Sequence, residues 1–389
     1  MVKRRKIGLI YQYNENWIGG TYYIENLISA LNKLPKDQKP KLIIFASNVN
    51  HFNILKSKTN YPFITRFSFN TSNVLIDRLI NKIWRTFTGI DFYREYFYKK
   101  KLDLVFPADY EKFFIKQQNF LYWIPDFQEH FFPEFFSTIE IKTRIKYQKQ
   151  IVQNARNIVF SSITTKKDFN LCYPESKLKE YVMPFSVTHS TLVIKENLLT
   201  YYNIPDFFFI CSNQFWKHKN HVVILKALAE LKKNGYYSFV VFTGKEHDYR
   251  NPEYYGELTD IAKELEVFEN IKFLGFISRE NQLGLMKKSV ATIQPSLFEG
   301  WSSVVEDVKA IGKPIIVSNI NVHQEQLQNY RYKDFFLPND AVSLANCMLN
   351  ASQKVDSLLK NDFEYHNDIL ACGECFMNIV EDINLMGSK

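Results

Sequence analysis

Short apolar runs and longer amphipathic segments alternate along the first half of the chain. The apolar runs predict strands, which we place at residues 6–11, 42–45, 102–106, 119–124 and 157–161. Between the first two runs, Ile24, Leu27, Ile28 and Leu31 recur at helical spacing, and residues 139–155 show a similar pattern. Strands that alternate with helices indicate an α/β fold with a doubly wound parallel sheet.

The alternation begins again after a polar break at residues 184–203, which we interpret as a linker. Strands are predicted at residues 207–211, 238–243, 271–274, 291–294 and 315–317. Helices are predicted at residues 221–234, 255–265, 282–288 and 304–311. Two successive α/β halves predict two Rossmann-like domains with a cleft between them, where ligands of such folds bind.

Composition supports a two-domain globular protein. A chain of 389 residues can bury two cores, and 46% hydrophobic with 23% charged residues is ordinary for such a protein. The net charge of +8 favours an anionic partner, such as a nucleotide diphosphate, an acidic membrane surface or a nucleic acid. Because no nucleic-acid-binding module accompanies the charge, nucleic acid is the weakest of the three.

Targeting and metal signals are not evident in the sequence. No apolar run approaches the ~20 residues that span a bilayer, and the basic N-terminus lacks the apolar core of a signal peptide. Five cysteines fit a reducing compartment, so we expect a cytoplasmic protein. Cys372 and Cys375 form a lone CxxC pair that nothing completes into a zinc site, and no metal is expected.

Two carboxylates stand out in residues 293–318, which read as a strand, a tight loop, a helix and a strand. Glu299 lies in the loop and Glu306 in the first helical turn. Amides at a helix N-terminus suit a diphosphate, and carboxylates accept hydrogen bonds from the hydroxyls of a sugar or ribose. Alternatively, Ser303 and Glu306 form a capping box and Glu299 is a solvated loop acid.

A basic cluster follows the strand at residues 207–211. Lys217, His218 and Lys219 are placed where the strand gives way to a helix. A fixed cation there stabilises the charge that develops on a departing diphosphate. The alternative is a solvated helix start, although lysines at a helix N-terminus oppose its dipole. We expect Lys219 to face the two glutamates across the gap between the domains.

Further candidates follow strands in the first half. Gly19 and Gly20 are expected in a loop where glycine lets the backbone approach a phosphate or sugar, although any sharp turn would use glycine too. Asp126 follows another strand and could orient an acceptor hydroxyl or take its proton, with His130 as runner-up. The alternative for Asp126 is a turn-forming residue after Pro125.

Residues 78–101 are basic and aromatic. They carry seven Lys or Arg residues, and apolar residues recur at i+4 just before and within them. Such a stretch can lie on an anionic bilayer. The alternative is a helix that packs on the core and exposes a charged outer face.

The segment FEGWSSVVE, with Glu299 and Glu306, resembles the paired-glutamate signature of family 4 retaining glycosyltransferases of the GT-B fold. The common family pattern has seven residues between the glutamates, and this chain has six, as in a bacterial subgroup with a shorter loop. Lys219 matches the family lysine, whereas Gln214 stands where the family has arginine. Asp126 follows Pro125 where the family has His-Asp.

The resemblance implies a GT-B fold with residues 1–187 as the acceptor-side domain, 188–369 as the donor domain, and 370–389 packing back on the first. It implies that Glu299 contacts the donor sugar and Glu306 the ribose, with Asp126 and Lys219 also catalytic. The expected donor-binding residues are Gly19, Gly20, Gln214, Lys217, His218, Lys219, Gly244, Phe276, Gly300, Trp301, Ser302, Ser303 and Glu306. The expected acceptor-binding residues are Asp126, Glu129 and His130.

The implied reaction is transfer of a hexosyl or deoxyhexosyl group, with retention, from a nucleotide-diphosphate-sugar to a hydroxyl of a saccharide or lipid-linked saccharide. Neither metal nor cofactor is expected. The expected setting is bacterial surface-polysaccharide synthesis, such as O-antigen or capsule, with possible peripheral membrane contact and no nucleic acid. The alternatives are a GT-B nucleotide-sugar epimerase or hydrolase, and a catalytically silent nucleotide-binding GT-B protein.

Overall fold

The computed structural model describes residues 4–14, 18–46, 48–67, 102–108, 119–189, 196–353 and 364–387. The chain forms two compact units. The first comprises Met1–Asp126, Lys142–Thr188 and His366–Lys389, and the second comprises Phe127–Ile141 and His189–Tyr365. Residues 127–141 thus belong with the second unit, whereas their place in the sequence assigned them to the first.

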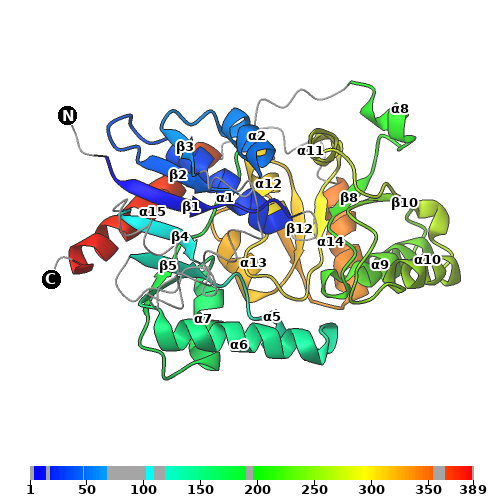
Figure 1. The fold of residues 1–389 in the computed structure, drawn as a ribbon. Coiled ribbons are helices and arrows are strands. Elements are labelled where there is room, and N and C mark those ends of the chain that lie inside the picture. The colour runs from blue at the N-terminus through cyan, green and yellow to red at the C-terminus, as the bar shows by residue number, and fades with distance from the viewer. Residues whose placement is uncertain are drawn as a thin grey trace. The chain divides into compact units, whose positions relative to one another are not determined.

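The described part of the first unit contains a seven-stranded sheet of order β3-β2-β1-β4-β5-β6-β7 (Figure 1). Its strands are β1 (Lys6–Ile10), β2 (Lys41–Phe45), β3 (Ile64–Arg66), β4 (Leu104–Ala108), β5 (Phe120–Trp123), β6 (Asn157–Phe160) and β7 (Lys179–Val182). All neighbouring strands are parallel. All four residues of β6 are buried, as a strand covered on both faces requires.

The helices of the first unit include the last helix of the chain. They are α1 (Ile18–Leu31), α2 (Val49–Thr59), most of α6 (Thr138–Asn154), α7 (Ile163–Cys172) and α15 (Tyr365–Gly387). Helix α15 lies close to α1, because a Cβ added at Gly373 would lie 2.8 Å from the carbonyl oxygen of Ala30. Its Glu381 accepts a 2.8 Å hydrogen bond from Arg5, beside the start of β1.

The described part of the second unit contains a six-stranded sheet of order β10-β9-β8-β11-β12-β13. The strands are β8 (Phe209–Ser212), β9 (Val240–Thr243), β10 (Ile271–Phe273), β11 (Thr292–Gln294), β12 (Ile315–Ser318) and β13 (Lys333–Phe336), all parallel to their neighbours. Strands β8 and β11 are neighbours although they are far apart in sequence. The strand order reverses between them, which is where doubly wound sheets bind ligands.

The described helices of the second unit lie before, between and after these strands in the sequence. They are α5 (Gln128–Phe131), α8 (Leu198–Tyr202), α9 (His221–Lys233), α10 (Tyr254–Glu264), α11 (Arg279–Lys288), α12 (Ser303–Ile311), α13 (Asn321–Gln326) and α14 (Ala341–Gln353). Short 3₁₀ turns lie at η2 (Pro133–Phe135), η3 (Lys217–Lys219) and η4 (Phe268–Asn270).

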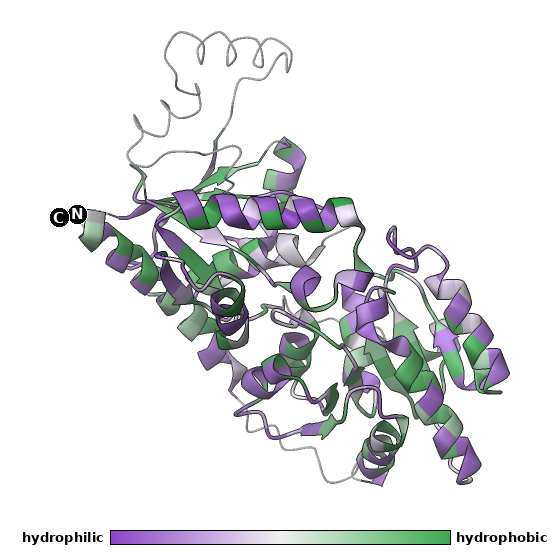
Figure 2. Ribbon diagram, turned by 90° about the horizontal axis from the view of Figure 1, so that it is seen from below, coloured by the Kyte–Doolittle hydropathy of each residue, from purple (hydrophilic) through white to green (hydrophobic). Residues whose placement is uncertain are grey.

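The sheet of the second unit is apolar on both faces. Phe209 and Cys211 of β8 join a core cluster with α9 and α14, whereas Ile210 joins another with α8 and α11. Successive side chains of a strand point to opposite faces, so this division follows from the strand period of two. Figure 2 shows the apolar strands (green) flanked by helices that also carry hydrophilic residues (purple).

Two local features differ from the sequence predictions. The segment interpreted as a linker contains the boundary between the units and also the short helix α8, which was not predicted and whose Leu198 is buried in a core cluster. A loop was predicted at Gly19 and Gly20, but they lie in the first turn of α1. A Cβ at Gly19 would meet nothing within 4 Å, so the local backbone does not require glycine there.

Gly244→Ala is expected to lower the free energy of unfolding by more than about 1 kcal/mol. Gly244 has φ of 148°, and an added Cβ would lie 2.0 Å from the carbonyl oxygen of Asn213. The control is Gly256→Ala in helix α10, where the Cβ has open space and the variant gains about 0.5–1 kcal/mol. Urea unfolding measures both, and equal stability of the two variants would contradict the expectation.

Candidate active site

The strongest candidate site lies in the second unit, where the carboxyl ends of β8 and β11 meet. The chain after β8 carries Asn213 and then η3, which ends at Lys219. The chain after β11 carries the loop with Glu299 and then helix α12. Because the two strands are parallel neighbours, both loops leave the sheet at the same edge.

Lys219 and Glu299 form a direct ion pair. The Lys219 Nζ lies 2.6 Å from Glu299 Oε1, and the two side chains are 14% and 10% exposed. The two residues therefore belong to one unit and touch, whereas the sequence led us to expect them on opposite sides of the gap between the domains. The pair puts a cation and a carboxylate at one point of the sheet edge.

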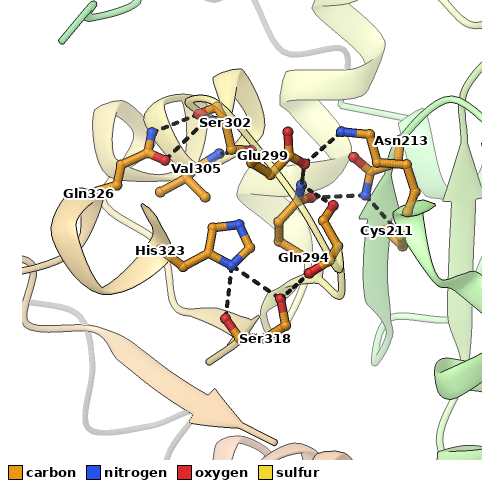
Figure 3. A network of polar contacts seen from close by, with 11 residues as sticks. Cys211, Asn213, Gln294, Glu299, Ser302, Val305, Ser318, His323 and Gln326 are labelled. Atoms are coloured by element: carbon orange, nitrogen blue, oxygen red, sulfur yellow. Dashed lines mark hydrogen bonds and ion pairs between the residues drawn. The ribbon is translucent and has the colours of Figure 1, made fainter. Parts of the chain in front are cut away.

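A buried polar network supports Glu299 (Figure 3). Gln294 Nε2, at the end of β11, donates to Glu299 Oε1 at 2.9 Å and to Ser296 Oγ at 3.0 Å. Asn213 Nδ2 donates to Gln294 Oε1 at 2.9 Å, which ties the β8 loop to the β11 loop. Asn213 and Gln294 could not be identified from the sequence, because buried amides carry no pattern that separates them from other polar residues.

The charge of Glu299 is stabilised in spite of its burial. Burial by itself raises the pKa of this carboxyl, but Lys219 outweighs that effect through its charge and hydrogen bond, and the net pKa is lowered. Glu299 is therefore an ionised hydrogen-bond acceptor near neutral pH. An ionised carboxylate that is held in place suits recognition of hydroxyl groups.

His323 of helix α13 lies beside this network and was missed by sequence reasoning. It is fully buried, and its Nδ1 lies 2.9 Å from the carbonyl oxygen of Ser318, to which a neutral ring donates (Figure 3). Burial lowers its pKa to about 4, although the nearby Glu299 acts in the opposite direction. At neutral pH the ring is uncharged and leaves the Lys219–Glu299 pair as the local charges.

Helix α12 begins one residue earlier than the capping-box interpretation required. Ser302 is its N-cap and accepts a hydrogen bond from the Val305 amide at 3.5 Å. Glu306 does not reach back to the cap, so the capping-box alternative is wrong. Gly312, with φ of 72°, ends the helix as the sequence predicted.

Glu306 turns instead toward three protein donors. Its Oε1 accepts from Lys309 at 3.0 Å and Gln326 at 2.8 Å, and its Oε2 accepts from Lys309 at 3.2 Å and Tyr365 at 2.6 Å. Burial raises the pKa of Glu306, and Lys309, Tyr365 and Gln326 only partly oppose the rise. The two predicted carboxylates thus lie in different electrostatic environments.

The other two residues of the basic cluster, Lys217 and His218, contact different parts of the second unit. Lys217 Nζ lies 3.4 Å from Glu257 Oε2, away from Glu299. His218 is buried, with its ring 5.4 Å from that of Trp216, and its carbonyl accepts from the Leu297 amide at 2.8 Å. His218 thus fixes the position of the loop before Glu299. The three residues form the η3 turn before α9 and do not lie in the first turn of a helix.

The remaining predicted donor residues have different degrees of exposure. Gln214 is half-buried and follows Asn213, and Gly244 packs its backbone against Asn213. Phe276 is 70% exposed in the loop after β10. In the loop before α12, Gly300 and Ser302 are buried, and Trp301 and Ser303 are half-buried.

The predicted acceptor residues are split between the units. Asp126 ends the first unit after β5, 3.6 Å from Arg144. Burial, and after it the charge of Asp126, raises the pKa of Asp168 to about 6. Glu129 and His130 belong to α5 of the second unit. The Glu129 side chain is fully buried, and its Oε1 lies 3.8 Å from His130 Nε2.

Residues 127–141 pack on the loops that carry the ion pair. Phe131 and Phe132 lie 5.7 Å and 5.9 Å, ring to ring, from Phe298, the residue before Glu299. The guanidinium of Arg250 lies 5.0 Å from the ring of Phe136. A segment that is close in sequence to Asp126 therefore covers the surroundings of Glu299.

Residues 202–369 match the sequence model of the family described as glycosyl transferases group 1. This stretch is a group 1 glycosyltransferase domain. It contains Lys219, Glu299 and Glu306, and it confirms the resemblance seen in FEGWSSVVE.

Curated relatives of the chain are matched over part of their length. The O-antigen chain mannosyltransferase RfbU of Salmonella typhimurium is 24% identical over 212 residues, which cover 54% of this chain and 55% of that protein. A putative glycosyltransferase of Bacillus subtilis, EpsF, is 30% identical over 106 residues, 27% and 26% of the two chains. The chain thus spans about half the length of the first of these relatives and about a quarter of the second.

Similar solved structures confirm the GT-B fold. A glycosyltransferase from Rickettsia africae has a TM-score of 0.67 at 17% identity, with 98% of both chains covered. HepE of Anabaena, solved with UDP and glucose, has a TM-score of 0.67 at 14% identity, with 97% of this chain and 100% of that chain covered.

The described residues show neither a metal cluster nor a membrane span. They contain no group of three or more His, Cys, Asp or Glu side chains placed to hold a metal ion. No helix in this part of the chain is long and apolar enough to cross a membrane. The basic stretch at 78–101 lies outside the described residues, so its contact with membrane or core stays a prediction.

Lys219→Met is expected to lower the free energy of unfolding by about 3 kcal/mol, because it leaves the buried Glu299 carboxylate without its cation. The double variant Lys219→Met/Glu299→Gln removes both charges and is expected to recover most of that loss. Urea unfolding at neutral pH measures all three proteins. A single variant as stable as the double variant would show that the pair is not electrostatically coupled.

Stability is expected to fall with pH in a window that His323 sets. Its folded pKa of about 4 is below the ordinary 6.5, so the unfolded chain binds more protons between these values. The stability that the neutral His323 ring contributes is therefore fully present above about pH 6.5 and is lost as pH falls toward about 4.

Across this pH window, the contribution of His323 to the free energy of unfolding is expected to change by about 3 kcal/mol. Urea unfolding of the native protein and of His323→Gln between pH 7.5 and pH 4 tests this. His221, buried with a pKa of about 3, is present in both proteins, so their difference isolates His323. Parallel pH profiles would refute the assignment.

Proposed function

We propose that this chain is a retaining glycosyltransferase that moves a hexosyl or deoxyhexosyl group from a nucleotide-diphosphate-sugar to a hydroxyl of a saccharide or lipid-linked saccharide. The observation that carries the proposal is the contact of Lys219 with Glu299 at the sheet edge of the group 1 domain. Sugar transfer from such a donor needs a cation that binds the diphosphate. It also needs a nearby group that accepts hydrogen bonds from the sugar hydroxyls. The Lys219–Glu299 pair supplies both.

Lys219 is proposed to bind the diphosphate. A lysine ammonium has three N–H donors, and Glu299 takes one of them, which leaves donors for phosphate oxygens. The first amides of α12, at Ser303 and Val304, are oriented toward an anion by the helix. These groups together would stabilise the charge on the leaving group, so the proposal requires no metal ion and no cofactor.

Glu299 is proposed to accept hydrogen bonds from the donor sugar, and Glu306 from the ribose. In the reaction the bond from the anomeric carbon to the phosphate oxygen breaks, and the electron pair leaves with the nucleoside diphosphate. The sugar becomes oxocarbenium-like, and the acceptor oxygen attacks on the same face. A donor phosphate oxygen takes the acceptor proton, so no protein nucleophile forms a bond to the sugar.

Asp126 is proposed to orient the acceptor hydroxyl from the first unit. Its neighbour Asp168 has a raised pKa of about 6, for which burial and the charge of Asp126 are responsible in that order. A carboxylate near a second, readily protonated carboxyl suits the handling of a hydroxyl proton.

The setting proposed is bacterial surface-polysaccharide synthesis at the cytoplasmic face of the membrane. RfbU is named for O-antigen mannosyl transfer, and HepE was solved with UDP and glucose. Both names favour a hexosyl donor for this chain, and the name of RfbU also favours a polysaccharide product. They also make UDP-glucose and GDP-mannose the first donors to test.

Glu299→Gln is expected to retain nucleotide binding and to lose sugar transfer by at least about 100-fold, because the amide removes a charge that acts at the reacting sugar. A thermal-shift screen of UDP-, GDP-, dTDP- and ADP-sugars first identifies the donor. Saturation at about 100 times the dissociation constant stabilises the folded protein by about 2.7 kcal/mol. Release of nucleoside diphosphate with and without a saccharide acceptor then gives the rate.

The matched control is Glu264→Gln, an exposed carboxylate on α10, which is expected to keep full activity. Hydrolysis or epimerisation without transfer would favour the enzymatic alternative. Nucleotide binding without any turnover in the native protein would favour the catalytically silent one. No shift with any nucleotide-sugar would overturn the proposal.

A further inference from the structure

Glu306 is a heavily hydrogen-bonded carboxylate of the proposed donor site. It is only 1% exposed, and the structure shows four contacts to its two oxygens. A carboxylate offers about four lone-pair positions to donors. The protein itself therefore occupies the positions that a ribose would need.

Two of the three partners could leave Glu306 only at the expense of an unpaired buried charge or of further hydrogen bonds. Lys309 contacts both carboxylate oxygens, at 3.0 Å and 3.2 Å, and is itself buried, so its removal would leave a buried charge unpaired. The Gln326 amide is anchored twice to Ser302, which donates to it at 3.1 Å and accepts from it at 2.7 Å. Displacing Lys309 would unpair a buried charge, and displacing Gln326 would break its two hydrogen bonds with Ser302.

Tyr365 is the partner that resembles a ligand group. Its hydroxyl donates to Glu306 Oε2 at 2.6 Å, in the way that a ribose hydroxyl would. The exchange of one neutral hydroxyl for another conserves the number of hydrogen bonds and leaves the charge pair with Lys309 intact. Tyr365 is also the last residue of the second unit, where α15 begins.

We propose that the Tyr365 hydroxyl occupies the place of a ribose hydroxyl on Glu306 in the nucleotide-free protein, and that the bound nucleotide replaces it. This inference rests on the proposed function, because it takes Glu306 to be the ribose ligand. Tyr365 then competes with the nucleotide and sets its affinity. It also keeps the buried carboxylate hydrogen-bonded while no nucleotide is present.

The test compares Tyr365→Phe with the native protein, using UDP and 2′,3′-dideoxy-UDP as probes in calorimetric titrations. Should another nucleotide stabilise the native protein better, its diphosphate and dideoxy analogue replace them. Tyr365→Phe is expected to bind UDP about tenfold more tightly, since the hydrogen bond to the competitor is gone. With the dideoxy analogue this gain in affinity is expected to vanish, because the analogue has no ribose hydroxyl that could donate to Glu306 Oε2.

The control is Tyr237→Phe, a 73% exposed tyrosine of the same unit, which is expected to leave both affinities unchanged. Weaker or unchanged UDP binding by Tyr365→Phe would overturn the inference, and an equal gain with both probes would do the same. If the native protein binds UDP and only the variant result fails, the proposed function stands. If no nucleoside diphosphate binds the native protein, both are rejected.

A second measurement avoids any loss of folding in the variant. Protein with 3-fluorotyrosine at position 365 keeps the hydroxyl and reports its surroundings by fluorine NMR. UDP is expected to shift this resonance and 2′,3′-dideoxy-UDP to leave it in place at saturation. A fluorine resonance that neither probe shifts, or that both probes shift equally, would contradict the exchange of hydroxyls.

Discussion

The ion pair between Lys219 and Glu299 is the interaction on which the arrangement of the site depends. Its partners come from loops after two strands that are adjacent in the sheet, although the two residues are 80 positions apart in sequence. Removing two charges from water is unfavourable, and only good geometry with further hydrogen bonds offsets the loss. Gln294 supplies such a bond to Glu299 and Asn213 holds Gln294, so the buried amides are as much a part of the site as the charges.

The two glutamates show how one residue type acquires two roles. Glu299 has a lysine at 2.6 Å and the Gln294 amide at 2.9 Å, and its net pKa is lowered. Glu306 lies deeper, and although Lys309 contacts both of its oxygens, burial raises its pKa. The first is an ionised acceptor, and the second is a carboxylate whose two oxygens are both contacted by protein donors.

The alternation of strands and helices predicted the fold well, because parallel strands that are buried on both faces need continuous apolar runs such as those at β8, β9 and β12. Glu299, Glu306 and Lys219 could be identified because their motif is local. Asn213, Gln294, His323, Gln326 and Tyr365 could not, since each acts through a contact between distant segments. The off-by-one start of α12 has a similar cause, because Ser302 and Ser303 are equally good caps by residue type.

Residues 127–141 belong to the second unit, although the chain on both sides of them belongs to the first. The chain leaves the first unit at Asp126, packs Phe131 and Phe132 on Phe298, and returns at Lys142. A contiguous fragment that begins at His189 would therefore lack the aromatic rings that cover the loop before Glu299. Such a fragment would leave Phe298 without these ring contacts, because the second unit is not one uninterrupted stretch of chain.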